Sequence, residues 1–385
     1  MDLATFEQLL TPTGQELLAE IADRAGIESD LGLGTRLRRT FVPELVAAAV
    51  TQNHLRGKAA AKFGPDAARL YFTHDALEQS TRMSVATHRA DRLAATGATS
   101  VVDLGCGIGG DLIALARAGL AVRGVELDPV RARVAAANLE ALGLGGEIVC
   151  GDAQEAVIGA DEVAFVDPAR RDARGRTFST ADLQPPWDWV KELLAGRAVA
   201  KVMPGLAHEA VPAGVEAEWV SDGGDLVEAC LWGVPFATTA RRATVLPADA
   251  GLVVGDGEPV PVADVGPYLY EPDDAVIRSG LVGELAATIG GWLPDAHIAY
   301  ISSDRGEPTP LARGFRVLEE LPFREKGLKA ALQTRGVGTL TIKKRGVDIV
   351  PEELIRRMKL KGRAKALVVM TRVQGAGRAY LVERL

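Results

Sequence analysis

A glycine-rich loop between a buried strand and a helix constrains this chain more than any other feature of its sequence. The loop reads Asp103-Leu-Gly105-Cys-Gly107-Ile-Gly109-Gly110 and follows an apolar, β-branched run at 100–104. Glycines at these positions permit a tight turn and let a ligand approach the backbone. The same spacing satisfies the G-x-G-x-x-G pattern of dinucleotide-binding proteins, so the loop by itself does not identify its ligand.

Short apolar runs alternate with Ala-rich helical segments from residue 100 onward, a pattern typical of a parallel sheet covered on both faces. We expect strands at 100–104, 121–126, 147–150, 163–167 and 198–203, and helices near 111–118, 129–142 and 182–194. Two later strands, 217–221 and 227–232, flank the turn signal Asp222-Gly223-Gly224 and are expected to pair antiparallel at one sheet edge. Five parallel strands closed by a late hairpin predict the Rossmann-like, seven-stranded α/β sheet of class I methyltransferases.

The chain is long enough for two or three domains. Residues 1–95 are expected to be helical, because apolar residues recur at helical spacing, and a last helix is expected over 77–95. The α/β sheet then occupies 96–238. Residues 239–385 are expected to form a separate α+β module, with helices at 278–289 and 351–360 and strands at 338–343 and 366–372.

Acidic residues at the ends of successive strands discriminate between the ligands that such a loop can hold. A dinucleotide would place its anionic pyrophosphate at the helix start, where the Asp103 carboxylate would repel it. S-adenosylmethionine (SAM) has no phosphate and carries a cationic amine and a cationic sulfonium, which a carboxylate attracts. Glu126 is suited to the ribose hydroxyls, and Asp152 with Ala153 to the adenine amine. We therefore expect SAM as the cofactor, held by Asp103, Gly105, Gly107, Glu126, Asp152 and Ala153.

Residues 77–170 resemble the trimethylguanosine synthase type of RNA guanine-N2 methyltransferase. The likeness is carried by Thr81, by the runs 85–90 (VATHRA), 101–110 (VVDLGCGIGG) and 126–129 (ELDP), by Asn138 and by Gly151-Asp152. In that family a Ser or Thr before the first strand helps to cover the cofactor, which implies this role for Thr81. The whole chain also resembles a bacterial group of class I methyltransferases with a C-terminal THUMP-like domain. That resemblance implies that the C-terminal module binds folded RNA, a tRNA or an rRNA.

The fourth strand ends in Asp167-Pro168-Ala169-Arg170, and this quartet departs from the guanine-N2 family. That family has Pro-Pro followed by an aromatic residue that stacks on the target base, so its absence leaves the target atom open. We expect Asp167 and the Pro168 carbonyl to accept hydrogen bonds from a base amine and to orient it for methylation. Arg170 and Arg171 are candidates for contact with the RNA.

Charge is distributed unevenly along the chain. The net charge is −7, yet the stretch from Arg324 to Arg372 holds fourteen Lys and Arg against four Asp and Glu, a local charge of +10. A basic end on an acidic body is typical of a protein with a polyanionic partner. Within this stretch we expect RNA contacts from Lys343, Lys344, Arg345, Arg356 and Arg357.

Composition narrows the remaining function classes. With 47% apolar and 25% charged residues, the chain is globular rather than disordered. No apolar run reaches the roughly 18 residues of a membrane span, and the cysteines and histidines show no metal-binding spacing. We therefore predict a cytoplasmic, SAM-dependent RNA methyltransferase without metal or membrane contact, in an undetermined oligomeric state. Two alternatives remain: a methyltransferase acting on a small molecule or protein, and a non-catalytic RNA-binding protein that retains SAM.

Overall fold

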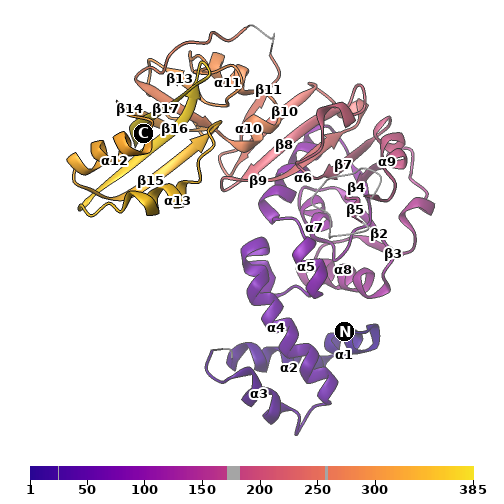
Figure 1. The fold of residues 1–385 in the computed structure, drawn as a ribbon. Helices are drawn as coiled ribbons and strands as arrows, with labels where there is room; N and C mark the ends of the chain where they lie inside the picture. Colours follow the sequence, from indigo (N-terminus) through magenta and orange to yellow (C-terminus); the bar gives the residue numbers. More distant parts are fainter. Residues whose placement is uncertain (25, 171–182, 256–258) are drawn as a thin grey trace. The chain divides into compact units, whose positions relative to one another are not determined.

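The computed structural model describes residues 1–24, 26–170, 183–255 and 259–385 (Figure 1). The chain divides into two compact units. One unit comprises Met1–Val215 and Cys230–Ala237, and the other comprises Glu216–Ala229 and Thr238–Leu385. No helix within the described ranges is long and apolar enough to cross a membrane.

The first unit begins with helices, as the apolar periodicity predicts. They are α1 (Leu3–Leu10), α2 (Pro12–Arg24), α3 (Asp30–Leu37), α4 (Pro43–Phe63), the 3-10 turn η1 (Gly64–Ala68), α5 (His74–Gln79) and α6 (Met83–Ala95). Asp2 caps α1 by accepting a hydrogen bond from the Thr5 N–H, and prolines occupy the first positions of α2 and α4, where no N–H is needed. Phe6, Leu17 and Ile21 are fully buried between these helices.

One predicted helix is divided in the structure. The expected helix over 77–95 is wrong at its start, because α5 ends at Gln79 and α6 begins only at Met83. Ser80 and Arg82 have extended backbones, with ψ of 139° and 138°. Neither Gly nor Pro marks this break, which is instead held by a distant lysine, described below.

The parallel strands follow the predicted order along the chain. They are β1 (Ser100–Leu104), β2 (Ala121–Glu126), β3 (Glu147–Cys150), β4 (Val163–Val166) and β7 (Ala198–Val202), joined by β8 (Glu216–Asp222) and β9 (Asp225–Trp232). The helices between them are α7 (Gly110–Arg117), α8 (Pro129–Leu142) and α9 (Trp187–Leu194). The sheet contains the methyltransferase order β3-β2-β1-β4-β7-β9-β8, which confirms the predicted Rossmann-like fold.

Two details around this sheet differ from expectation. The helix predicted over 182–194 begins at Trp187, because Pro185 and Pro186 lack amide hydrogens and disfavour helical backbone before them. Ahead of it, β6 (Leu183–Gln184) pairs antiparallel with β5 (Ala169–Arg170).

The prediction that the 217–232 hairpin lies at one edge of the sheet is also wrong. β10 (Arg241–Leu246) runs parallel to β8, and β11 (Ala250–Val253) pairs antiparallel with β10, so the sheet has nine strands. Short 3-10 turns occur at η2 (Ala153–Glu155), η4 (His208–Ala210) and η5 (Val234–Phe236).

The second unit contains a six-stranded sheet in the order β13-β12-β14-β17-β16-β15. Its strands are β12 (Tyr268–Pro272), β13 (Ile301–Ser303), β14 (Ala312–Leu321), β15 (Val337–Arg345), β16 (Ala364–Val373) and β17 (Ala376–Arg384). Its helices are α10 (Asp274–Arg278), α11 (Val282–Thr288), α12 (Glu325–Thr334) and α13 (Pro351–Met358). The helix predicted over 278–289 is wrong at its start, because α11 begins only at Val282, after Gly280 takes a left-handed φ of 71°.

Apolar side chains lie on both faces of this second sheet. On one face Leu340 and Ile342 of β15 pack with Leu354 and Met358 of α13. On the other face Phe315, Val369 and Tyr380 form a separate core. Alternation along β15 therefore places Lys344 on the α13 side of the sheet, and Lys343 and Arg345 on the opposite side.

Candidate active site

The glycine-rich loop is tied to the neighbouring strand by its backbone. The N–H groups of Gly105 and Cys106 donate to the Val125 carbonyl at 2.8 and 3.1 Å. Gly105 and Gly107 have φ of +105° and +57°, a region that other residues rarely adopt. A Cβ atom built on either glycine meets nothing within 4 Å, so their outer face is open to a ligand.

Asp103 lies directly below this loop with its side chain buried. It is 2% exposed, and its Oδ1 atom has no hydrogen-bond partner among the described residues. Burial raises the pKa of Asp103 well above its usual range, and the negative charges of Asp111 and Asp167 raise it further. A buried carboxylate surrounded by acids is stabilised by a cationic ligand.

The other predicted cofactor residues lie at the ends of the next two strands. Both carboxylate oxygens of the buried Glu126 already accept backbone hydrogen bonds, from Gly107 at 2.8 Å and from Asp128 at 3.0 Å. Glu126 therefore fixes the shape of the loop. Asp152 is exposed and caps the short turn η2, which starts at Ala153, through a 2.9 Å bond from the Gln154 N–H. The Gly151 N–H donates to the Glu126 carbonyl at 3.0 Å, which holds the two strand ends together.

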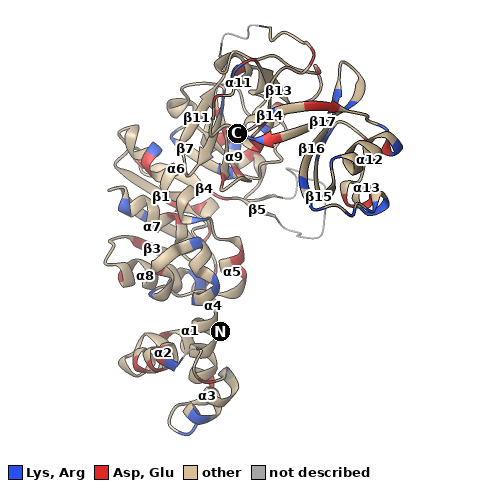
Figure 2. Ribbon diagram, turned by 90° about the vertical axis from the view of Figure 1, so that its left-hand side faces the viewer, with Lys and Arg blue, Asp and Glu red and all other residues tan. Residues whose placement is uncertain are grey.

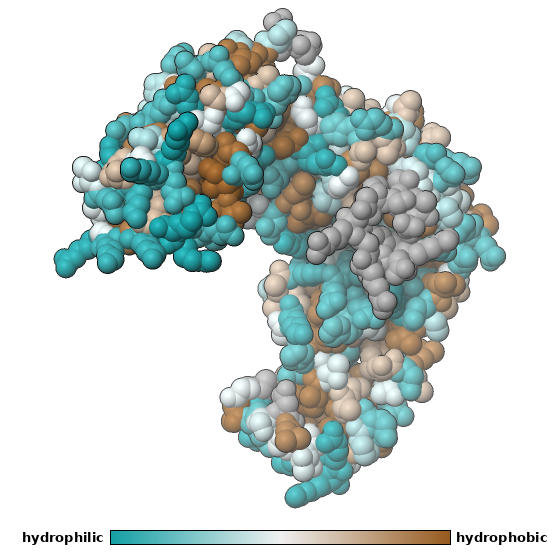
Figure 3. Space-filling model, in the orientation of Figure 1, coloured by the Kyte–Doolittle hydropathy of each residue, from teal (hydrophilic) through white to brown (hydrophobic). Residues whose placement is uncertain are grey.

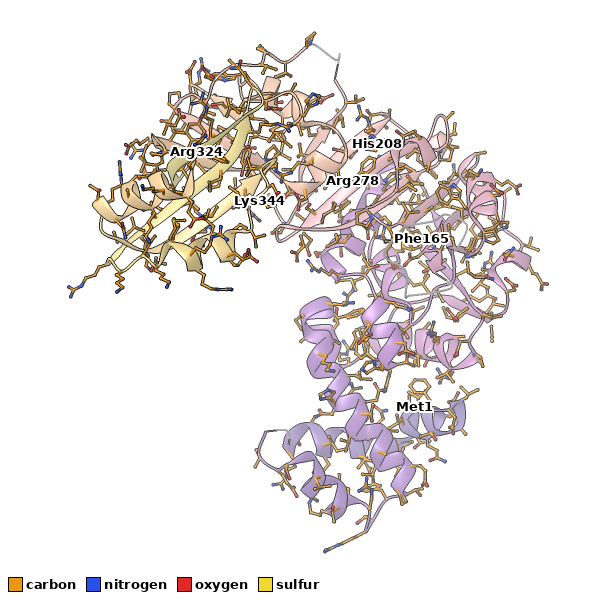
Figure 4. The ribbon with its side chains drawn as sticks, viewed as in Figure 1. Met1, Phe165, His208, Arg278, Arg324 and Lys344 are labelled. Carbon is orange, nitrogen blue, oxygen red and sulfur yellow. The ribbon has the colours of Figure 1, made fainter. Side chains whose placement is uncertain are left out.

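Thr81 belongs to a polar cluster that the sequence analysis did not identify. Its hydroxyl lies 3.2 Å from Oδ2 of Asp111, in the first turn of α7, and Arg89 of α6 forms an ion pair with Oδ1 of the same carboxylate. The Arg89 guanidinium also lies 4.9 Å from the ring centre of Phe165. Phe165 belongs to β4 and is labelled in Figure 4. The only sequence signal was that Thr81 and Arg89 both stand in the stretch that carries the family resemblance.

Asp167 and Pro168 lie where β4 ends, beside the glycine loop. The β1–β4 register pairs Leu104 with Val166, so Asp167 follows on the strand next to Gly105. Lys201 at the end of β7 forms an ion pair with Oδ2 of Asp167. The sequence does not reveal this lysine, because nothing in a strand sequence indicates which residue will face the end of a neighbouring strand. The backbone of Arg170 belongs to β5, and Arg171 lies outside the described residues.

The predicted RNA-contacting residues of the second unit differ in whether acidic residues of the same chain already pair with them. Lys343 forms an ion pair with Glu271, and Arg345 lies 3.9 Å from Asp274. Arg357 lies 3.1 Å from Glu325 and 3.7 Å from Glu353. Much of the charge of these three residues is thus neutralised within the chain.

Lys344 and Arg356 remain the better candidates for contact with an external polyanion. Both are exposed, and neither forms an ion pair within the described part of the chain. Positions of Lys and Arg are coloured blue on the ribbon along α12, α13 and β15 in Figure 2, and the surface over α12 and α13 is mainly hydrophilic in Figure 3.

Fold and site together define a class I, Rossmann-like methyltransferase, and comparisons with known proteins agree. The chain is 40% identical over 336 residues to an S-adenosylmethionine-dependent methyltransferase of Mycobacterium tuberculosis strain CDC 1551, and equally to one of strain H37Rv. Each alignment covers 84% of this chain and 91% of the relative, and both relatives are named as uncharacterized. The chain therefore belongs to this family of SAM-dependent methyltransferases.

Matches over parts of the chain and a solved structure add to this picture. Residues 312–384 match the THUMP domain-like family, and residues 2–59 match a domain of unknown function, DUF8688. A crystal structure from Porphyromonas gingivalis W83, described as a methyltransferase, aligns with a TM-score of 0.79 at 23% identity. It covers 96% of this chain and 98% of that one, which shows a shared fold.

The described residues fit a bound SAM. The Oδ1 atom of Asp103 is a buried acceptor without a partner in the described ranges, as a cationic amine requires. The open space over Gly105 and Gly107 lets a ligand approach the backbone. The buried Asp103 carboxylate does not suit an anionic pyrophosphate, because it would repel it.

Proposed function

We propose that this methyltransferase modifies a nitrogen atom of a base in structured RNA, a tRNA or an rRNA. The observation that carries this proposal is the position of Asp167 and Pro168 at the end of β4, next to the glycine loop. The THUMP-like match at 312–384 and the local charge of +10 between Arg324 and Arg372 support an RNA substrate.

The proposed cofactor contacts assign a role to each strand end. Asp103 binds the cationic amine, the backbone at Gly105 and Gly107 lies against the ligand, and Glu126 reaches the ribose hydroxyls. Asp152 and Ala153 lie by the adenine, and Thr81 covers the site. When bound, SAM supplies an electrophilic methyl group.

The exocyclic amine of a base is a weak nucleophile, because its lone pair is delocalised into the ring. The Asp167 carboxylate and the Pro168 carbonyl accept hydrogen bonds from this amine and orient its lone pair. Formation of the bond between this nitrogen and the methyl carbon would release the donor's sulfur with its electron pair. The Asp167 carboxylate would stabilise the positive charge that grows on the nitrogen, which would then lose a proton to solvent. Lys201 holds that carboxylate through the ion pair.

The residues of the second unit that we propose to contact RNA are Lys344 and Arg356, with weaker contributions from Lys343, Arg345 and Arg357. Arg170 and Arg171 of the first unit remain candidates for contact with the RNA. We retain the regions 1–95, 96–238 and 239–385 as the proposed functional division. An acidic body with a basic module favours a polyanionic substrate over a small neutral one.

Mass spectrometry of nucleosides from cells with and without this protein tests the proposal. We expect one methylated nucleoside to disappear from tRNA or rRNA in its absence and to return with the wild-type chain but not with Asp167→Ala. Transfer of radiolabelled methyl to a protein or metabolite fraction, with none to RNA, would favour the small-molecule or protein alternative. RNA binding without transfer to any fraction would favour a non-catalytic RNA-binding protein.

A further inference from the structure

Helix α4 connects the N-terminal helices to the cofactor loop through a buried amide. Gln52 of α4 is 1% exposed, and its side chain pairs with both backbone groups of Phe72. Its Nε2 donates to the Phe72 carbonyl at 2.7 Å, and its Oε1 accepts from the Phe72 N–H at 3.0 Å. Residues 71–72, here called the strap, are thereby fixed to α4.

A second buried amide joins the strap to the glycine loop. The Oδ1 atom of Asn138 in α8 accepts from the Tyr71 N–H at 2.7 Å, and its Nδ2 donates to the Tyr71 carbonyl at 3.1 Å. The same Nδ2 donates to the carbonyl of Ile108, inside the loop, at 2.9 Å. Gln52, the strap, Asn138 and Ile108 thus form one hydrogen-bonded chain in which each buried polar group is satisfied.

The end of α4 reaches the site at two further points. A Cβ atom on Gly110, where α7 begins, would lie 3.5 Å from the ring of Phe63, the last residue of α4. One position earlier, Lys62 donates to three backbone carbonyls: Leu77 at 2.8 Å, Glu78 at 2.7 Å and Ser80 at 2.7 Å.

Lys62 accounts for the break between α5 and α6. Carbonyls at the C-terminal end of a helix have no partner within the helix and attract a cation. All three ammonium hydrogens of Lys62 are used there, which fixes the corner that presents Thr81. Burial lowers the pKa of Lys62, and the positive charges of Lys201 and Arg82 lower it further. The three carbonyls therefore hold a charge at this corner, although burial and the neighbouring positive charges oppose it.

We propose that α4 shapes the cofactor site through two positioning residues. Lys62 positions the α5–α6 corner, and Gln52 positions the glycine loop. This role extends to the N-terminal domain of unknown function matched over residues 2–59, since Gln52 lies within it. The proposal rests on cofactor binding at the glycine loop and is independent of the RNA substrate.

A graded series at position 62 tests the proposal by calorimetric titration with S-adenosylhomocysteine (SAH) in the absence of RNA. Lys62→Arg can still donate to several carbonyls, Lys62→Gln to two at most, and Lys62→Met to none. We expect the Kd for SAH to rise in that order, by about threefold to thirtyfold for Lys62→Met. Lys58→Met, an exposed lysine one turn earlier on α4, is the matched control and should bind as the wild type does.

Each titration is made well below the Tm of the variant, where the protein is folded. A change in Kd for SAH then reports on positioning of the site and not on loss of stability. A lower Tm with an unchanged Kd for SAH in Lys62→Met would overturn the proposal. If that variant does not fold, Lys62→Gln and Gln52→Glu decide the question by the same criterion. Faster hydrogen exchange of the 78–83 amides, together with the raised Kd, is the expected accompanying result. Failure of the wild-type chain to bind SAH would overturn the proposed function itself, and this inference with it.

Discussion

Replacement of Asp103 by asparagine should stabilise the free protein and weaken its affinity for the cofactor. The Asp103 carboxylate is buried, and burial and neighbouring acids raise its pKa. Keeping this group ionised costs folding free energy that a neutral amide of the same shape does not cost. The same charge attracts the cationic amine of the ligand. Removal of this one charge should therefore raise the stability of the free protein and lower its affinity for the ligand. A purely structural residue would not show this combination.

The size of the binding effect follows from the chemistry of the contact. A hydrogen bond to a charged group contributes about 1.5–3 kcal/mol, so loss of the charge should weaken SAH binding by about 10- to 150-fold. At an SAH concentration of about 100 times the wild-type Kd, binding raises the free energy of unfolding of the wild type by about 2.7 kcal/mol, which corresponds to a rise in Tm of about 5–10 °C. At the same SAH concentration, the free energy of unfolding of the variant should rise by about 0.3–1.4 kcal/mol.

The raised pKa of Asp103 determines how the stability of the free protein changes with pH. In the unfolded chain Asp103 loses its proton near its ordinary pKa of 3.8, and in the fold its pKa is higher. Between these values the free folded state binds more protons, so its stability falls as the pH rises through that window. A bound cationic amine favours the ionised form, so the SAH-induced rise in Tm should grow with pH there.

Thermal melts with and without SAH across this pH range, paired with calorimetry, provide the assay. Asp103→Asn should remove the growth with pH, and Asp161→Asn, an exposed acid in a turn, should retain it. An unchanged SAH affinity in Asp103→Asn would refute the reasoning, as would a ligand-induced rise in Tm that shrinks with increasing pH.

Three further expectations concern catalysis, stability and RNA. Asp167→Ala should abolish radiolabelled methyl transfer while calorimetry still detects SAH binding, because its carboxylate serves the substrate; joint loss of both would make the residue structural. Asn138→Leu leaves three buried backbone groups without a partner, at about 1–3 kcal/mol each, and should lower the urea midpoint; an unchanged midpoint would contradict the hydrogen-bonded chain. Reversing Lys344 and Arg356 to Glu should reduce the salt dependence of RNA binding by about one logarithmic unit of slope per contact in filter binding. Lys343→Gln, whose lysine is already paired with an acid, should leave most of that slope in place, and equal effects would argue against the proposed surface.

Local signals in the sequence were sufficient for the centre of the fold. The strands at 100–104, 121–126 and 147–150 and the helix at 129–142 have the predicted bounds. Signals within a few residues of each element mark where it starts and ends. The helix at 129–142, for example, is capped by Asp128, starts with Pro129, and ends before Gly143, which has a left-handed φ of 71°. The glycine loop is equally local, so its ligand class could be inferred from Asp103.

The features that could not be predicted from the sequence depend on contacts between distant segments of the chain. Lys201 meets Asp167 across 34 positions, Asn138 meets Tyr71 across 67, and Lys62 reaches Ser80 across 18. The sheet edge formed by β10 and β11 likewise depends on strand pairing and not on any turn signal. Caps, breakers and periodicity act over one or two turns of chain. The partners of a buried lysine, amide or carboxylate are instead fixed only when packing excludes water, so that each polar group must bond to the protein groups that surround it.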